Sequence, residues 1–230
     1  MHPGQGRQMK MRNSTLACAT LMASSLLAGG AQASTNLLTN GSFETPPTQG
    51  YNNTCGGGCV YSTGEAIPGW SITGAATGQW IPDTNPGGFN YLPNRVTVGY
   101  SNGGTIDQVA SATVVAGQTY DLSAFVGRRL DVYYAAPTVQ LLINGNVVAT
   151  ATGATPAKGD WLDWTTSYTA TAGQAGQSIE VLLTAPGAQS DFDEVSLTVV
   201  PEPAAWALMV LGLAGAGAAL RNRRRLAVTA

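Results

Sequence analysis

The feature that most constrains the fold is an alternation of apolar and polar residues with a period of two. Its clearest occurrence is at 138–143 and 146–152, which flank the pair Asn144-Gly145. An Asn-Gly pair adopts the positive φ angles of a type I′ turn, and alternation on both sides of it is typical of a β-hairpin. The sequence therefore predicts a hairpin here.

The same pattern continues along the chain from residue 105 to residue 199. Segments 105–115 and 119–127 flank Ala116-Gly117, which predicts a second hairpin. Later strands are marked by three alternating sets: Trp164, Thr166, Tyr168 and Ala170; Ile179, Val181 and Leu183; Val195, Leu197 and Val199. No stretch keeps a helical period, and Gly, Pro and Asn residues separate the strands. We predict an all-β fold, an antiparallel β-sandwich or jelly roll, with Trp70 and Trp164 in its core.

The N-terminal 33 residues have the features of a signal peptide. Lys10 and Arg12 precede an apolar stretch at 16–28, and Ala31-Gln32-Ala33 supplies the small residues that signal peptidase accepts. We predict cleavage after Ala33, with Met9 or Met11 as the true start of translation. The folded domain then begins at residue 34.

The C-terminal 30 residues predict a membrane-inserted segment. Residues 204–220 carry no charge and would form about 26 Å of helix, which is long enough to cross a thin bilayer. An arginine cluster follows at once, formed by Arg221, Arg223, Arg224 and Arg225. Since positive residues stay in the cytoplasm, the domain at 34–200 is expected outside the inner membrane.

The order of these elements resembles the PEP-CTERM sorting signal. Pro201-Glu202-Pro203 comes first, then the apolar span, then the arginine cluster at the end of the chain. The resemblance implies that an exosortase, a membrane protease, processes the 201–230 tail and releases the protein to the cell surface or an exopolysaccharide matrix. A permanent single-span anchor is the alternative.

Charge and histidine content exclude several functions. Residues 34–200 contain four basic and twelve acidic side chains, a net charge of −8, which argues against a nucleic-acid partner. Neutral polysaccharides and divalent cations remain compatible with this charge. The one histidine, His2, lies in the predicted leader, so the mature domain has no histidine for a catalytic triad or a zinc site.

Four short segments resemble, in order, the galactose-binding-like β-sandwich found in many carbohydrate-binding modules. They are 36–44 (NLLTNGSFE), 67–70 (IPGW), 115–123 (VAGQTYDLS) and 192–197 (FDEVSL). The resemblance implies a structural calcium ion held by Glu44 and Asp193. Asp193 is also in phase with Val195 and Leu197, so it is expected to point inward, where a carboxylate must be coordinated or hydrogen-bonded. A capped, hydrogen-bonded aspartate at a strand edge is the alternative.

Cys55 and Cys59 are the only thiols that remain after the leader is removed. A disulfide between them is favoured outside the inner membrane, and its short loop should contribute about 2 kcal/mol. We expect it to stiffen a surface turn more than to hold the fold.

Sugar binding needs exposed aromatic rings beside polar groups. The candidates are Trp80, Tyr91 and Tyr134, with Arg128, Asp131 or Asn90 to contact hydroxyls. Each ring is equally compatible with loop packing, and the Arg128-Arg129 pair with a salt bridge to Asp131 or Asp121. We expect a non-catalytic, exported glycan-binding protein. The alternatives are a structural matrix protein without a glycan ligand and a glycoside hydrolase or lyase using two carboxylates.

Overall fold

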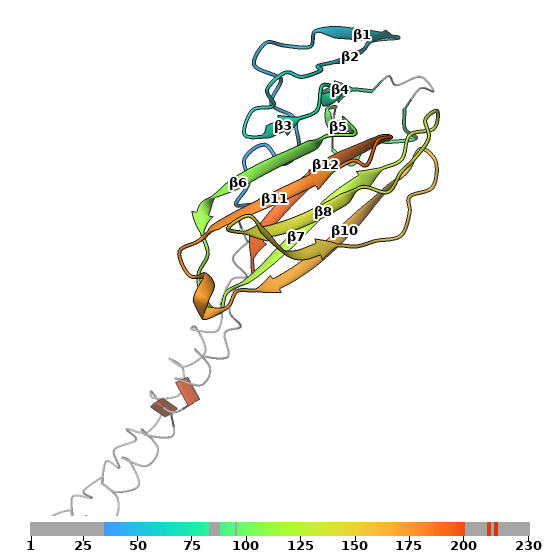
Figure 1. The fold of residues 1–230 in the computed structure, drawn as a ribbon. Coiled ribbons are helices and arrows are strands. Elements are labelled where there is room, and N and C mark those ends of the chain that lie inside the picture. The colour runs from blue at the N-terminus through green and yellow to red at the C-terminus, as the bar shows by residue number, and fades with distance from the viewer. Residues whose placement is uncertain (1–34, 83–87, 95, 201–210, 213, 216–230) are drawn as a thin grey trace, which may run out of the picture. The chain divides into compact units, whose positions relative to one another are not determined.

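The computed structural model describes residues 35–82, 88–94 and 96–200, together with 211–212 and 214–215. Within this part of the chain twelve strands form (Figure 1). They are β1 (Asn53–Gly56), β2 (Cys59–Tyr61), β3 (Ser71–Thr73), β4 (Thr77–Ile81), β5 (Val98–Asn102), β6 (Thr105–Thr113), β7 (Thr119–Gly127), β8 (Thr138–Ile143), β9 (Asn146–Ala151), β10 (Trp161–Thr169), β11 (Ser178–Thr184) and β12 (Gln189–Val199). One 3₁₀ turn, η1 (Ala172–Gln174), separates β10 from β11.

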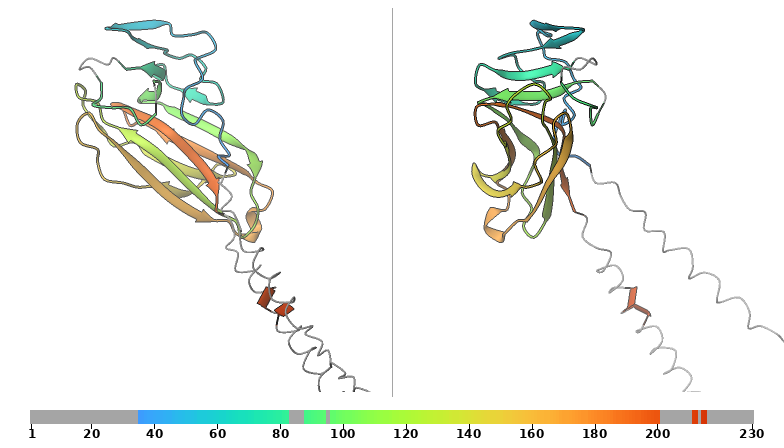
Figure 2. Two further views of the ribbon diagram at one scale, coloured as in Figure 1. Left: turned by 180° about the vertical axis from the view of Figure 1, so that it is seen from behind. Right: turned by 90° about the vertical axis from the view of Figure 1, so that its right-hand side faces the viewer.

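The strands form two antiparallel sheets that pack face to face (Figure 2). The larger sheet has seven strands in the order β1-β2-β4-β5-β12-β7-β10, and the smaller has five in the order β3-β6-β11-β8-β9. All of the strand pairs are antiparallel. The predicted all-β antiparallel sandwich is confirmed.

The Asn144-Gly145 hairpin forms as predicted. β8 pairs with β9, and the two turn residues have φ angles of 50° and 73°, as a type I′ turn requires. Gly145 has nothing within 4 Å of the position of a Cβ atom, so conformation and not space makes glycine suitable there.

The predicted hairpin around Ala116-Gly117 is wrong, although both of its strands exist. β6 pairs with β3 and β11 in the smaller sheet, whereas β7 pairs with β10 and β12 in the larger one. Gly117, with a φ of 79°, lies where the chain crosses between the sheets. Because each strand turns its apolar face to the space between the sheets, the alternation is the same as that of two paired strands.

The main core fills the space between the two sheets. Trp70 and Trp164 are both buried in it, as predicted, and Phe43 stacks on Trp70 with ring centroids 5.3 Å apart. The segment before Phe43 runs along the last strand, where Leu37 donates its backbone N–H to the carbonyl of Leu197 at 2.8 Å. The first and last parts of the domain are therefore held together at the edge of the core.

The seven-stranded sheet is also buried over part of its other face. A second apolar cluster lies there, formed by Cys59, Trp80, Val98, Tyr100 and Trp161, with Tyr61, Phe89, Leu92 and Phe125 packed against it. On β7, Phe125 belongs to this cluster whereas its neighbours Ala124 and Val126 belong to the main core. Further along the same face, Asp121 on β7 and Thr165 on β10 are exposed, so the cover is limited to the part of the sheet around this cluster.

A bulge in β12 changes the expected orientation of Asp193. The pairing of β12 with β7 shifts between Asp193 and Ser196, and Glu194 has a φ of 48°. Phe192, Val195 and Leu197 all lie in the main core, so the extra residue puts Asp193 out of phase with Val195 and Leu197. Asp193 is fully buried, as expected, but not by facing the main core.

The predicted targeting segments lie outside the described residues. These are the signal peptide at 1–33, the motif Pro201-Glu202-Pro203, most of the apolar span at 204–220 and the arginines at 221 and 223–225. Among the residues that are described, no helix has the length and apolar character needed to span a bilayer.

Replacement of Gly99 by valine should destabilise the domain. A Cβ atom at Gly99 would lie 2.8 Å from the ring of Phe43, which is fully buried against Trp70. We expect Gly99→Val to lower the free energy of unfolding by about 1–3 kcal/mol in urea denaturation. Gly173→Ala is the control, because nothing lies within 4 Å of its Cβ position. Equal stability of the two variants would contradict this packing.

Candidate functional site

A pocket of about 570 Å³ opens on the outer side of the seven-stranded sheet. Its lining combines aromatic rings with amide, hydroxyl and charged groups. The lining residues are Cys55, Cys59, Tyr61, Thr63, Ala76, Trp80, Tyr100, Asn102, Arg129, Asp131 and Gln189. A cavity of this size and mixed composition suits a small organic ligand.

The strand period explains why these residues meet. On β4 and the residue before it, Ala76 and Trp80 share one face, and on β5 the same face carries Tyr100 and Asn102. Gln189 lies at the start of β12, and Asp191 follows it on the same face. Three strands, β4, β5 and β12, thus turn alternate residues toward the side of the sheet on which the pocket opens.

Asp191 lies directly beneath the pocket wall and is fully buried. Its Oδ1 accepts hydrogen bonds from Trp80 Nε1 at 3.0 Å and from Gln189 Nε2 at 2.8 Å. Its Oδ2 is buried and has no hydrogen-bond partner among the described residues. Burial raises the pKa of this carboxyl to about 7, against the lowering effects of Gln189, Arg129 and Trp80.

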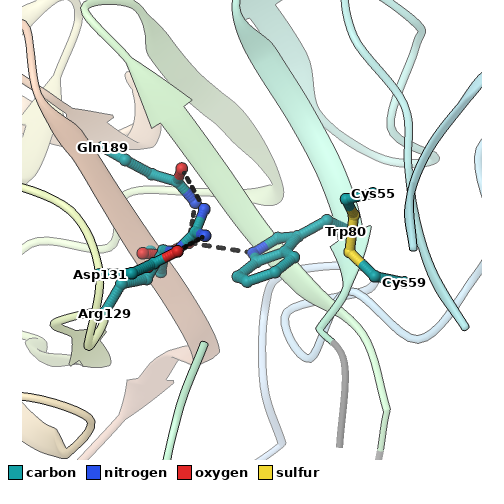
Figure 3. Close-up of a disulfide and its surroundings, with 7 residues drawn as sticks. Cys55, Cys59, Trp80, Arg129, Asp131 and Gln189 are labelled. Carbon is teal, nitrogen blue, oxygen red and sulfur yellow. Dashed lines mark hydrogen bonds and ion pairs between the residues drawn. A yellow bond between two sulfur atoms is a disulfide. The ribbon is translucent and has the colours of Figure 1, made fainter. Parts of the chain in front are cut away.

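Arg129 connects the buried acid to the pocket rim (Figure 3). Its Nε and Nη2 donate to the two carboxylate oxygens of Asp131 at 3.0 and 2.9 Å, and its Nη1 donates to Gln189 Oε1 at 2.7 Å. The guanidinium also lies over the Trp80 ring, 4.7 Å from its centroid. The Arg129–Asp131 ion pair is one of the two salt bridges that the sequence allowed for this arginine pair. Because Arg129 also holds the Gln189 side-chain oxygen, the Gln189 amide N–H is directed toward Asp191.

The four predicted ligand-binding residues are not brought together. Trp80 lines the pocket, but its side chain is 5% exposed and packs in the second cluster. Tyr91 is half-exposed and donates its hydroxyl to the Trp161 carbonyl at 3.2 Å. Arg128 lies 5.5 Å from the centroid of Tyr134 and donates to a loop carbonyl, and neither residue lines the pocket.

The predicted calcium ligands Glu44 and Asp193 are both engaged by backbone N–H groups. Glu44 Oε1 accepts from Val96 and Thr97 at 2.9 and 3.0 Å, and Asp193 accepts from Asn94 and Glu194 at 3.2 and 2.8 Å. Burial, together with the smaller effects of the Glu194 and Glu44 charges, raises the pKa of Asp193 to about 7, against the lowering effect of its two backbone hydrogen bonds. In the described part of the chain no group of three or more His, Cys, Asp or Glu side chains is placed to hold a metal ion.

The structure joins Cys55 and Cys59 by a disulfide, with their Cα atoms 5.2 Å apart. Cys55 is exposed, whereas Cys59 is buried in the second cluster, and both line the pocket. The bond is therefore part of the candidate site as well as of a surface turn.

Sequence reasoning missed most of this pocket. No recognisable motif includes Gln189, Tyr100 or Asp191. The sequence resemblance indicated Asp193 instead, two residues after Asp191. The available signal was the alternation itself, because Gln189 and Asp191 form a polar face opposite Ser190 and Phe192. Whether this polar face becomes part of a site depends on which side of the sheet is covered and on the residues that cover it.

Two families match the chain. The HpiC1-like family, described as HpiC1 cyclase, matches residues 34–198, and the PEP-CTERM protein-sorting motif matches residues 199–225. The second match confirms the sorting resemblance: the protein is exported for exosortase sorting and reaches the cell surface. A comparison with curated protein sequences finds no significant match.

Solved structures share the fold. A Stig cyclase, Fisc, from Fischerella sp. TAU in complex with (3Z)-3-(1-methyl-2-pyrrolidinylidene)-3H-indole has a TM-score of 0.58 and 19% identity, covering 74% of this chain and 99% of its own. A cyclase from the same organism in complex with 4-(1H-indol-3-yl)butan-2-one has a TM-score of 0.56 and 20% identity, covering 71% and 96%. The CBM22 tandem domain of Paenibacillus barcinonensis Xyn10C has a TM-score of 0.44 and 17% identity, covering 75% and 49%.

The family match overturns the expectation that the protein is not an enzyme. That expectation relied on the absence of histidine and of a recognisable catalytic segment. A carboxyl group whose pKa is raised by burial can transfer protons without histidine, and burial is not visible in the sequence. Because the match covers residues 34–198, most of the chain, the protein belongs to the HpiC1-like family of cyclases.

Proposed function

We propose that the exported domain is a cyclase-type enzyme that binds a small organic ligand in the pocket beside Trp80 and uses Asp191 as proton donor. The observation that carries this proposal is the buried Asp191 carboxyl, hydrogen-bonded to two residues that line the pocket. Its pKa of about 7 leaves a large fraction of the carboxyl protonated at neutral pH. A general acid works best when its pKa is near the working pH.

The hydrogen bonds around Asp191 indicate which oxygen carries the proton. Oδ1 accepts two N–H bonds, so in the acid form the proton belongs on Oδ2. After the proton leaves, the same two N–H groups and the nearby Arg129 charge stabilise the carboxylate. Because Asp191 has no exposed surface, direct contact with a ligand requires a movement of Trp80, Arg129 or Gln189.

The composition of the pocket favours a flat, largely apolar ligand with a polar substituent. Tyr61, Trp80 and Tyr100 offer ring surface, and Asn102, Gln189 and Arg129 supply polar groups. The cyclase structures with indole compounds support a ligand of this class.

A glycan is the second candidate ligand. Aromatic rings beside amide and carboxylate groups are also what a pyranose requires, and export to the cell surface brings the pocket into contact with polysaccharide. In this case Trp80 and Tyr100 would stack on sugar rings, with Asn102 and Asp131 contacting hydroxyls. The protein would then associate with the exopolysaccharide matrix, after signal peptidase has removed residues 1–33 and exosortase has processed the tail.

A structural calcium ion at Glu44 and Asp193 remains a proposal. The two carboxylates are close enough for the Glu44 charge to raise the pKa of Asp193, so a cation between them would relieve repulsion. They would supply only part of the six to eight oxygens that calcium takes, and backbone carbonyls and water would supply the rest. The backbone N–H bonds that both carboxylates accept fit the capped aspartate equally well.

The proposed chemistry can be tested by solvent proton transfer. The full-length exported protein is incubated in D₂O with 4-(1H-indol-3-yl)butan-2-one, and deuterium incorporation into carbon is followed by NMR. We expect Asp191→Asn to bind the compound but to slow incorporation about a hundredfold, the usual contribution of a general acid. Asp121→Asn, an exposed aspartate on β7, is the control and should behave as wild type.

Calorimetric titration with the same compound and with solubilised host exopolysaccharide distinguishes the two ligands. Binding of the indole compound that disappears in Trp80→Ala supports the first proposal. Binding of polysaccharide alone, lost in the same variant, favours the glycan. Wild-type incorporation rates in Asp191→Asn would show that this carboxyl is not the proton donor.

Stability should fall as the pH rises from about 4 to 7. Asp191 and Asp193 have pKa values raised from 3.8 to about 7, so the folded protein holds protons that the unfolded chain releases in this window. We expect the free energy of unfolding at pH 5 to exceed that at pH 8 by on the order of a few kcal/mol. Urea denaturation in EGTA measures it, and Asp191→Asn should flatten the slope. A stability that rises with pH would contradict the buried state of both acids.

Removal of calcium should lower the melting temperature of the wild type by several degrees if the ion is bound. The physical reason is that two close carboxylates then face each other without a cation. Glu44→Gln is the matched variant, and it should lose the response to EGTA. An unchanged melting temperature, together with no calcium by elemental analysis, would reject the site.

A further inference from the structure

The tip of the β1–β2 hairpin forms one wall of the pocket. Cys55 precedes Gly56, the last residue of β1, and Cys59 begins β2. Both cysteines line the cavity together with Trp80. Figure 3 shows the disulfide on one side of Trp80 and the group of Arg129, Asp131 and Gln189 on the other. The position of the tip therefore affects the shape of the site in which a ligand would bind.

This wall is weakly attached to the rest of the sheet. β1 is the outermost strand of the larger sheet and pairs with β2. β2 in turn pairs with β4 at two positions, Val60 with Ile81 and Tyr61 with Trp80. A two-stranded hairpin on its own is marginally stable in water, so these contacts alone do not fix its tip.

The base of the hairpin is better held than the tip. Ser62 donates its backbone N–H to the carbonyl of Gln79 at 2.8 Å, and Tyr100 donates its hydroxyl to the carbonyl of Ser62 at 2.8 Å. At the tip, Gly56, Gly57 and Gly58 all have positive φ angles and are exposed. Nothing lies within 4 Å of the Cβ positions of Gly56 and Gly58, so the tip gains no packing there.

The disulfide links the exposed strand to the apolar cluster. Cys59 is 5% exposed and packs with Trp80, Val98 and Tyr100, whereas Cys55 is exposed on β1. The bond ties β1 to a residue that the cluster already holds. Without the disulfide, the pairing of β1 with β2 would hold the wall in position. That pairing shifts register between Thr54 and Gly56.

We propose that the Cys55–Cys59 disulfide is a binding-site element that fixes this wall, and that the pocket reaches its full affinity only after export, when the bond forms. The inference rests on the proposed ligand-binding function of the pocket. Bond formation removes two electrons and two protons from the two thiols. A protein disulfide in the exported compartment accepts them by thiol–disulfide exchange and leaves as a dithiol.

A purely stabilising disulfide would give a different result. Its loss would lower the melting temperature, but below that temperature the affinity of the pocket and the exchange of the hairpin amides would stay the same. A disulfide that fixes the wall changes both while the domain remains folded. The two roles are therefore separable at a temperature well below unfolding.

The test compares the oxidised full-length protein with the same protein reduced by a phosphine, and with Cys55→Ser. This variant breaks the bond but leaves the buried Cys59 side chain in place. Alkylation and mass spectrometry first establish the redox state of each sample. Hydrogen exchange of residues 53–61 is then measured, with the β8–β9 hairpin, which has no cysteine, as the internal control.

We expect reduction to speed exchange in residues 53–61 about tenfold, as local opening does, and to leave β8–β9 unchanged. The dissociation constant for 4-(1H-indol-3-yl)butan-2-one should rise by a similar factor, and Cys55→Ser should match the reduced protein. Unchanged exchange, or unchanged affinity, would overturn the inference. If the oxidised protein binds no probe, the proposed function fails, and hydrogen exchange alone then decides whether the disulfide fixes the wall.

Discussion

The seven-stranded sheet is buried on both faces where β4, β5 and the start of β12 lie, and the candidate site follows from this constraint. One face supplies half of the main core, and the other carries the cluster around Trp80 and Trp161. Alternate residues of these three strands are therefore covered on both sides. Where the outer cover is incomplete, between the β1–β2 hairpin and the chain after β7, the pocket remains.

Double burial also explains the two acids of β12. In a sandwich with one solvated face, Asp191 would be an ordinary exposed carboxylate, and its pKa would stay near that of a free aspartate. Here the outer face is covered, so desolvation disfavours its charged form. The hydrogen bonds from Trp80 and Gln189 keep the group in place without removing that cost. A domain without histidine thereby contains a buried carboxyl group whose pKa is raised to about 7.

Export affects the candidate site through the edge of the larger sheet, which β1 and β2 form. The β1–β2 hairpin, which closes the pocket, lies at the edge of the sheet. Because β1 is attached to the sheet through β2, the Cys55–Cys59 disulfide fixes the position of the hairpin tip. An edge strand that leads into a turn of three consecutive glycines needs a further contact to hold it in place. Outside the cytoplasm the two cysteines can be oxidised to the disulfide that holds this strand. Export therefore affects the shape of the pocket as well as the location of the protein.

The sequence by itself determined the strands between 105 and 199, the Asn144-Gly145 hairpin, the burial of Trp70 and Trp164 and the sorting signal. These depend on neighbours along the chain, such as a period of two, a turn pair or an ordered set of terminal motifs. Tertiary structure alone decided that β6 and β7 lie in different sheets, that a bulge turns Asp193 out of phase, and that Trp80 is buried over Asp191. The physical reason is that alternation shows that a strand has two faces but not what covers each face. The pKa of a carboxyl, and with it the chemistry, depends on that cover.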